Sequence, residues 1–438
     1  MARHDMALST AALVVLGALG AAGCRNKPTH RRAGDAAAVE ILSAPVVPDG
    51  GAREVAEEVE PNDADDAATV LPLGGTVHGK IDPEGDVDRY RIDVAVAGAL
   101  SVMVDPHDAL DAVLEIEDPG GTVIARSARG GARIREGVPN LAVTPGRYTA
   151  VVRRAVPPAP PPSKRKPAKR PPEPGKPAGG PYEITAAAVA IAPGFEREPD
   201  DDRGQANDLI AGDTGNGYIG WSGDADVWKV SVEALSARNA LDIELSAIEG
   251  IALTLEISDG IGHPITTRKG PRGGPLVVRG FVPQVPAGAP PFHYLTVKAD
   301  RSNPETAYQI RATAKLIAPD AEAEPNDTPD TAMPVPPDRK SLHAHWSTGD
   351  VDCFAIAPED AARTLDVSID TPSDLDLAID VLLDGKLSAK VDHPGKGAAE
   401  KLVVSVPAGA RAVIRVHGSE AVGDGNYDLV IEEAAASP

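Results

Sequence analysis

The chain has 438 residues, of which 42% are hydrophobic and 25% are charged. This composition is typical of a folded, soluble protein and excludes a largely disordered chain or a polytopic membrane protein, and the length predicts roughly three domains. The formal net charge of −22 argues against binding to nucleic acid, because that binding depends on basic side chains that neutralise phosphates. The two cysteines, Cys24 and Cys353, exclude a disulfide framework and a cysteine-rich zinc site.

The amino terminus has the pattern of an export signal. Arg3 precedes an uncharged, largely apolar stretch over residues 7–23, which is typical of a signal-peptide core. The stretch ends in Ala-Ala-Gly-Cys24, which resembles the lipobox of bacterial lipoproteins, although Ala21 stands where Leu is usual. We therefore interpret 1–23 as a lipoprotein signal peptide and Cys24 as the lipidation site, which would anchor the protein by its acyl chains. An uncleaved signal anchor or ordinary secretion is the second interpretation.

A polar stretch over residues 24–57 follows and shows neither a helical nor a strand period, so it is predicted to be a flexible tether. Arg25, and not Asp, follows the cysteine. By the same resemblance this favours the outer membrane, and we expect an exported, cell-envelope lipoprotein.

Three segments of the chain repeat without gaps, and a recurring period identifies the structural unit. Each contains Glu-x-Glu-Pro-Asn/Asp-Asp and later Gly-Asp-x-Asp-x-aromatic. The second Glu and the first Asp of the later motif are 26 residues apart in all three copies, from Glu60 to Asp86, Glu198 to Asp224 and Glu324 to Asp350. The predicted repeats are 58–192, 193–317 and 318–436.

Each repeat continues as short segments with the alternation of a half-buried strand. Tyr90, Ile92 and Val94 are separated by charged residues, and Trp228 begins a similar run. Short strands separated by turn residues predict an all-β chain of three tandem antiparallel β-sandwich domains, jelly-roll-like in type. Further strands are predicted at 112–116, 253–257, 377–381, 294–298 and 412–416, and closing strands that begin with Tyr at 182–187, 308–313 and 427–431.

These motifs, a Pro-Ala-Gly turn in the second and third copies and the Tyr-initiated last strand together resemble the bacterial pre-peptidase C-terminal domain. That family includes the collagen-binding domains of clostridial collagenases. The resemblance extends over nearly all of 58–433, and in the second copy Asp200 stands where the others have Asn. It implies binding modules, which in this family are usually appended to secreted peptidases and anchor the enzyme to substrate or assist export.

The recurring carboxylates would repel one another without a cation, and Ca²⁺ takes six to eight oxygen ligands. The resemblance implies the same ion, because collagen-binding members use the first acidic segment together with downstream Asp residues. An alternative is that these residues cap turns through local hydrogen bonds and need no metal. Carried over by position, the candidate calcium ligands are Glu58, Glu60, Asn62, Asp63, Asp86, Asp88, Glu196, Glu198, Asp200, Asp201, Asp224, Asp226, Glu322, Glu324, Asn326, Asp327, Asp350 and Asp352.

A Pro/Lys-rich insertion over 157–181 interrupts the first repeat. It contains 11 Pro in 25 residues and has a net charge of +5. Such a stretch favours extended polyproline II and cannot close a core. We interpret it as a solvated spacer, and the alternative is electrostatic contact with an anionic envelope polymer or an acidic protein.

Catalytic motifs are absent from the sequence: it has no His-Glu-x-x-His, Gly-x-Ser-x-Gly or phosphate-binding Gly-x-x-x-x-Gly-Lys-Ser/Thr. His343 and His345 would share one face of a strand, as a metal pair or in packing against Trp346, and Cys353 is expected to be an unpaired thiol opposite the buried Phe354. We expect a non-enzymatic lipoprotein whose modules, stabilised by calcium, bind an extracellular or envelope protein or polysaccharide. The alternative is an accessory subunit of a separately encoded secreted peptidase or hydrolase.

Overall fold

A computed structural model describes residues 55–82, 85–156, 179–418 and 423–433. Within these ranges the chain forms β-strands and no helix, so the all-β prediction is confirmed. Accordingly, no helix that could cross a membrane occurs in this part of the chain. The predicted signal peptide, Cys24 and most of both the tether and the Pro/Lys-rich insertion lie outside the described residues.

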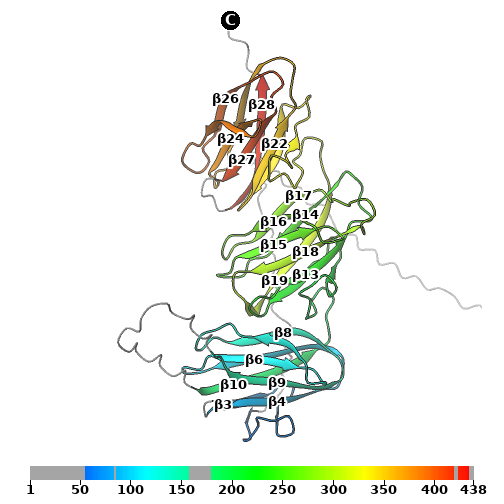
Figure 1. Cartoon of the computed structure of the whole chain (residues 1–438), viewed down its shortest axis with the longest axis vertical. Helices are drawn as coiled ribbons and strands as arrows, with labels where there is room; N and C mark the ends of the chain where they lie inside the picture. Colours follow the sequence, from blue (N-terminus) through cyan, green and yellow to red (C-terminus); the bar gives the residue numbers. More distant parts are fainter. Residues whose placement is uncertain (1–54, 83–84, 157–178, 419–422, 434–438) are drawn as a thin grey trace, which may run out of the picture. The chain divides into compact units, whose positions relative to one another are not determined.

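The strands form three β-sandwiches, numbered along the chain (Figure 1). Sandwich 1 consists of β1 (Val55–Glu57), β2 (Thr69–Val70), β3 (Thr76–Ile81), β4 (Val87–Val94), β5 (Gly98–Pro106), β6 (Ala112–Glu117), β7 (Val123–Ser127), β8 (Glu136–Val143), β9 (Gly146–Arg154) and β10 (Gly180–Val189). Sandwich 2 consists of β11 (Asn207–Leu209), β12 (Thr214–Ile219), β13 (Asp226–Ser231), β14 (Asn239–Leu245), β15 (Leu253–Ser258), β16 (Pro264–Lys269), β17 (Leu276–Phe281), β18 (Phe292–Ala299) and β19 (Asn303–Leu316). Sandwich 3 consists of β20 (Met333–Pro334), β21 (Ser341–Ser347), β22 (Val351–Ile356), β23 (Arg363–Ile369), β24 (Leu377–Leu383), β25 (Lys386–Val391), β26 (Glu400–Val406), β27 (Ala412–Gly418) and β28 (Asp424–Glu433).

Each sandwich repeats one strand order in two facing sheets. In sandwich 1 the sheets are β1-β3-β10-β5-β8 and β2-β4-β9-β6-β7. Sandwich 2 has β12-β19-β14-β17 and β11-β13-β18-β15-β16, and sandwich 3 has β21-β28-β23-β26 and β20-β22-β27-β24-β25. Most neighbours pair antiparallel, and the first short strand of each second sheet pairs parallel. The three copies therefore place equivalent residues at equivalent positions.

Three separate hydrophobic clusters fill the spaces between the paired sheets. Tyr90, Trp228 and Phe354 are fully buried in them, as their alternation with polar residues predicts. Each strand predicted from the sequence lies inside an observed strand, although the observed closing strands β10, β19 and β28 begin before their Tyr.

Two predicted boundaries of sandwich 1 are wrong by a few residues. Val55–Glu57 was assigned to the tether but forms β1, which pairs parallel with β3. The Pro/Lys-rich insertion was extended to Pro181, but β10 begins at Gly180. In both places the backbone joins the edge or end of a sheet, and this pairing does not require a hydrophobic period in the sequence.

Neighbouring sandwiches contact each other through the same backbone pairing at both junctions. The second Glu of the acidic segment adds in parallel to the edge strand of the preceding sandwich, Glu198 beside β8 and Glu324 beside β17. Glu198 N donates to Asn140 O at 3.0 Å, and Glu324 N donates to Gly280 O at 3.0 Å. Both acceptors lie at a β-bulge and have positive φ, 53° at Asn140 and 67° at Gly280. The bulge turns a carbonyl of the edge strand toward the next sandwich.

His343 and His345 lie on one face of β21, as predicted, but the gapless alignment of the repeats, which matches His343 to Gly79, is wrong here by one residue. Ala344, and not His343, lies opposite the closing-strand tyrosine, as Gly79 does in sandwich 1. Both histidines therefore point away from the core. His343 is exposed beside Asp428, and only His345 is half-buried.

Cys353 has no exposed surface. This is unexpected, because Phe354 beside it faces the core and neighbouring residues of a strand point to opposite faces. Burial, only partly offset by Arg415, raises the pKa of its thiol to about 12. The thiol is therefore protonated near neutral pH and is a poor nucleophile.

Candidate metal centres

The acidic segment of each repeat is folded back on itself and fastened to the strand that carries the later motif. The second Glu accepts a hydrogen bond from the backbone N–H two residues on, at 2.9 Å in Glu60, 3.0 Å in Glu198 and 2.8 Å in Glu324. The peptide bond between this Glu and the following Pro is cis in all three copies. The residue after this Pro accepts from the later strand through its carbonyl, as in Asn62 O with Arg89 N at 3.2 Å.

This folding brings three carboxylates of each repeat together. They are the first and second Glu of the acidic segment and the second Asp of Gly-Asp-x-Asp, and one oxygen of each lies within 4.8 Å of the other two. We call these residues, with the Asn or Asp that follows Pro, the inner set. The three inner sets are Glu58, Glu60, Asn62 and Asp88; Glu196, Glu198, Asp200 and Asp226; and Glu322, Glu324, Asn326 and Asp352.

The first Glu of each inner set is held by the first sheet of its own sandwich. It accepts a backbone N–H from Lys80 at 2.7 Å, from Tyr218 at 2.6 Å and from His345 at 2.8 Å in the three copies. These donors occupy one position of β3, β12 and β21. The same distant strand residue therefore orients the first carboxylate in every copy.

The closing-strand tyrosines complete the clusters, and sequence reasoning did not place them there. Tyr427 donates to Asp352 at 2.6 Å, and Tyr182 donates to Asp88. In sandwich 2 the hydroxyl of Tyr308 accepts from Trp228 Nε1 at 2.8 Å. The signal was present, because Tyr recurs at the start of all three predicted closing strands, but only the fold shows that its hydroxyl reaches the carboxylates.

Two oxygens of the inner set are buried without a hydrogen-bond donor in every copy. One belongs to the residue after Pro, as Asn62 Oδ1, Asp200 Oδ1 or Asn326 Oδ1. The other belongs to the second Asp, as Asp88 Oδ1, Asp226 Oδ1 or Asp352 Oδ1. Buried polar atoms usually have a partner, so the same two unpartnered oxygens in three copies point to a ligand that is not part of the chain.

Burial makes the negative charges of these clusters unfavourable. It raises the pKa of Asp88 to about 8, of Asp200 to about 7 and of Asp224 to about 8, and neighbouring carboxylates add to the shift. In sandwich 3 it raises the pKa of Glu322 to about 7. The pKa values of Glu196, Glu198, Asp226, Glu324 and Asp352 are also raised well above their usual values, for the same reasons. A bound cation would remove this penalty.

The remaining candidates form an outer set, which is the last Asp of the acidic segment and the first Asp of the later motif. The outer sets are Asp63 and Asp86, Asp201 and Asp224, and Asp327 and Asp350. Asp86 caps a local turn, as the alternative interpretation expected, by accepting from Asp82 N at 2.6 Å. Asp63 and Asp201 instead accept from Val87 N and Ala225 N, 24 positions away, both at 3.3 Å.

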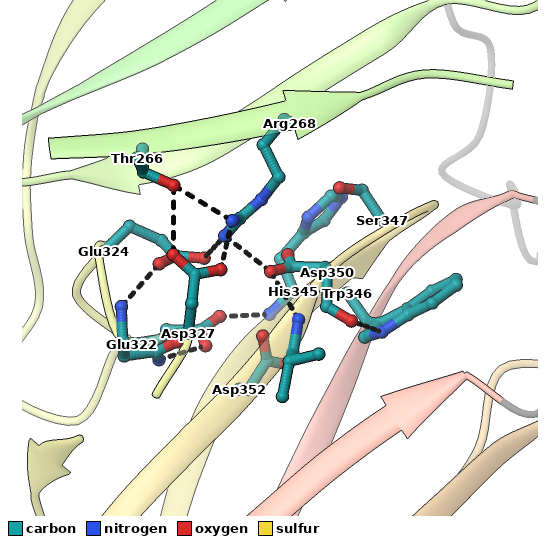
Figure 2. A network of polar contacts seen from close by, with 12 residues as sticks. Thr266, Arg268, Glu322, Glu324, Asp327, His345, Trp346, Ser347, Asp350 and Asp352 are labelled. Carbon is teal, nitrogen blue, oxygen red and sulfur yellow. Dashed lines mark hydrogen bonds and ion pairs between the residues drawn. The ribbon is translucent and has the colours of Figure 1, made fainter. Parts of the chain in front are cut away.

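The three clusters differ in how they are covered. In sandwich 1 Glu60 and Asp63 are exposed, whereas the whole inner set of sandwich 2 is buried. Within the described residues no basic side chain forms an ion pair with the sandwich 2 cluster. In sandwich 3 Arg268 from β16 enters the cluster from sandwich 2 and contacts Glu324, Asp327 and Asp350 (Figure 2).

The inner set fits calcium by its chemistry. All of its side-chain donors are carboxylate or amide oxygens, the ligands that Ca²⁺ prefers, and no thiolate or imidazole belongs to it. His343 and His345 do not join a cluster with metal-ligand spacing in the described part of the chain. Each inner set could contribute two glutamates, one aspartate and one Asn or Asp oxygen, and water or backbone oxygens would complete the coordination.

Comparison with known proteins gives similarity only at the level of solved structures. No protein-family model matches the chain, and no curated protein sequence matches it. The pre-peptidase C-terminal domain of collagenase from Bacillus anthracis is 16% identical, with 27% of this chain and 93% of that chain covered and a TM-score of 0.20. The CBM22-1–CBM22-2 tandem domain of Paenibacillus barcinonensis Xyn10C is 11% identical, with 47% and 82% covered and a TM-score of 0.15. The functional assignment below therefore rests on the geometry of this chain.

Proposed function

We propose that the protein is a non-catalytic binding protein of the cell envelope, exported and lipidated at Cys24, whose β-sandwiches bind calcium at their inner sets. The recurrence of the same two unpartnered, buried oxygens beside two glutamates in all three sandwiches carries the calcium assignment. The oxygen-only donor set supports calcium over a transition metal.

Calcium in the inner set would stiffen the entry to each sandwich. The ion would join the acidic segment to the strand that carries the second Asp, so that two segments 26 residues apart are held together. In sandwiches 2 and 3 the second Glu of that segment also pairs by its backbone with the preceding sandwich. The cation would therefore order the junctions as well as the sandwiches.

The partner we propose is an extracellular or envelope protein or polysaccharide. The net charge of −22 favours a neutral or basic partner over an acidic one. A non-catalytic role is supported by Cys353, the one cysteine in the described residues, which is buried with a raised thiol pKa.

Thermal unfolding of the full chain tests calcium binding. The melting temperature is measured in EDTA, in about 1 mM calcium and in an equal concentration of magnesium. For a dissociation constant near 0.1 mM, calcium would stabilise each binding sandwich by roughly 1.4 kcal/mol. Equal shifts with magnesium, or no shift with calcium, would contradict the assignment.

A matched pair of variants locates the effect. Asp88→Asn removes an inner-set charge of sandwich 1, whereas Asp93→Asn changes an exposed aspartate that pairs with Arg91 and Arg147. We expect the first variant to lose the calcium response of sandwich 1 and the second to keep it.

Metabolic labelling tests the lipid anchor separately. In a bacterial host fed radiolabelled palmitate, the full chain should incorporate label and fractionate with membranes. Cys24→Ser should lose both properties, and Cys353→Ser should keep both. Label that persists in Cys24→Ser would refute lipidation at this residue.

A further inference from the structure

Arg268 is a buried cation supplied by one sandwich to the acidic cluster of the next. Its side chain is 3% exposed. Nη2 lies 2.9 Å from Glu324 Oε1 and 2.6 Å from Asp350 Oδ1, and Nη1 pairs with Asp327. Figure 2 shows Arg268 and Thr266 reaching from one strand toward these carboxylates. Thr266 adds a hydrogen bond to Asp327 at 3.0 Å.

The other sandwiches have no equivalent of this arginine. Strand pairing places Arg268 opposite Leu255, Ser127 opposite Leu114, and Val391 opposite Ile379. In each sandwich this partner and the second Asp pair with the same residue of the strand between them, as holds for Leu255, Leu114 and Ile379. Arginine at this position is therefore specific to sandwich 2.

The local surroundings explain why Arg268 turns toward sandwich 3. In sandwich 1 a buried acid, Glu136, lies beside the equivalent residue and accepts from Ser127 Oγ at 2.5 Å. Sandwich 3 has Glu400 at the same place in its edge strand, but sandwich 2 has Leu276. Within the described residues of sandwich 2 the guanidinium bonds only to Thr266, so its acidic partners all come from sandwich 3.

The oxygens that Arg268 neutralises have unpartnered counterparts in sandwich 2. Glu324 Oε1 corresponds to Glu198 Oε1, and Asp350 corresponds to Asp224, whose Oδ1 is free of donors. Both counterparts are buried. Arg268 leaves Asn326 Oδ1 and Asp352 Oδ1 of the inner set without a donor. The arginine thus neutralises both outer-set aspartates and one oxygen of the inner-set Glu324, and leaves the Asn326 and Asp352 oxygens of the inner set available.

We propose that Arg268 takes the place of an outer divalent cation in sandwich 3, whereas in sandwich 2 Glu198 and Asp224 bind that cation. This inference rests on the proposed calcium function and refines it. Sandwich 3 then binds one ion and sandwich 2 binds two. The junction between sandwiches 2 and 3 is closed by a guanidinium that stays charged at any ordinary pH, while the junction between sandwiches 1 and 2 depends on metal.

Calcium stoichiometry of the full chain tests the substitution. Bound calcium is measured by equilibrium dialysis and metal analysis at saturating concentration. Arg268→Gln should bind one more equivalent than the native chain, and Arg268→Gln with Asp350→Asn should return to the native count. Arg272→Gln, which breaks an exposed pair with Asp300, should leave the count unchanged.

A second comparison keeps the native arginine and does not depend on the folding of Arg268→Gln. Asp224→Asn should lose one equivalent of calcium, because it removes a ligand of the outer ion. Asp350→Asn should lose none, because its native partner is Arg268. An equal loss in both variants, or no gain in Arg268→Gln, would overturn the substitution while leaving calcium binding intact. If the native chain binds no calcium, the proposed function fails, and with it the substitution.

Discussion

Asp226 shows most clearly why a cluster would favour a bound cation. Its carboxylate is fully buried, and neither oxygen accepts a hydrogen bond of good geometry. Burial and the neighbouring Asp224 and Asp200 raise its pKa well above the usual value, and the adjacent side chains of Tyr308 and Glu196 offset this only in part. A carboxylate in this position destabilises the metal-free sandwich and becomes favourable only when a cation is bound.

Asp226→Asn should therefore change stability in opposite directions with and without calcium. In EDTA the variant should be more stable by about 1–3 kcal/mol, because it removes an unsatisfied buried acid. In calcium it should be less stable than the native chain, because a ligand is lost. Thermal unfolding in the two buffers measures both effects. Asp208→Asn, at an exposed surface pair with Lys229, is the control and should change neither. Destabilisation of Asp226→Asn in EDTA would contradict this reasoning.

The raised pKa values also predict how stability depends on pH. Asp200 has a pKa of about 7 and Asp224 of about 8 in the folded, metal-free chain, above the usual value of 3.8. The folded state therefore binds more protons than the unfolded state between about pH 4 and pH 8, and its stability falls as pH rises through this window.

In EDTA the melting temperature should be higher at about pH 5 than at about pH 8. With saturating calcium this trend should be abolished or reversed, because the ion binds the deprotonated carboxylates. Melting curves over this range measure both effects. A metal-free protein that is more stable at the higher pH would show that the clusters do not control the dependence.

The repeated acidic motifs predicted the carboxylates that the fold brings together, but not the other side chains that reach them. Both glutamates and the second Asp of each copy meet as one group. The tyrosines were missed because their hydroxyls reach the cluster from the last strand, for example Tyr182 to Asp88, which are 94 positions apart. Spacing within a motif carries no information about such a contact.

At the scale of elements, the β-bulges of β8 and β17 lie in the edge strands that pair with the next acidic segment. Gly280 has φ of 67°, and a Cβ there would lie 3.1 Å from the carbonyl oxygen of Glu322. β26 occupies the same place in sandwich 3 but pairs with β23 without a register shift. The bulge is therefore present in the two sandwiches that are followed by another sandwich and absent from β26 of sandwich 3.

Gly280→Ala should weaken the junction between sandwiches 2 and 3. Gly288→Ala is a matched control, because Gly288 also has positive φ, 83°, but a Cβ there meets nothing within 4 Å. Both variants should lose about 1–2 kcal/mol from left-handed backbone. Gly280→Ala should lose more and become more sensitive to proteolysis between sandwiches 2 and 3. Equal losses and equal proteolysis would exclude a role of the bulge in docking.

The period of two predicted the strands because each sheet buries one face, and this pattern is local. The alternation also holds over β21, but the gapless alignment of the repeats fails there, because the third repeat has one more residue before the strand and one fewer after it. The spacing of 26 conceals this compensation, so that His343 and His345 were aligned one position away from their structural equivalents, His78 and Lys80.

At the scale of the whole molecule, the net charge of −22 opposes the compact state through self-repulsion. In EDTA, raising the salt concentration from about 0.01 M to about 0.1 M shortens the Debye length from about 30 Å to about 10 Å and should raise the melting temperature. Saturating calcium should reduce this gain, since bound ions already lower the net charge. The melting temperature measured at both salt concentrations tests this. A melting temperature that falls with added salt would indicate that attractive surface ion pairs outweigh the repulsion.

The sequence by itself determined the all-β class, the strands and the acidic residues that meet in each sandwich, because these follow from local periods and repeated motifs. Tertiary structure alone decided that Arg268 enters the cluster of the next sandwich, 56 positions away from Glu324, and that Ser127 and Val391 leave the equivalent places uncharged. A contact made once, between residues that do not repeat, leaves no periodic signal. Only the packing of one sandwich edge against the next acidic segment brings such residues within reach of each other.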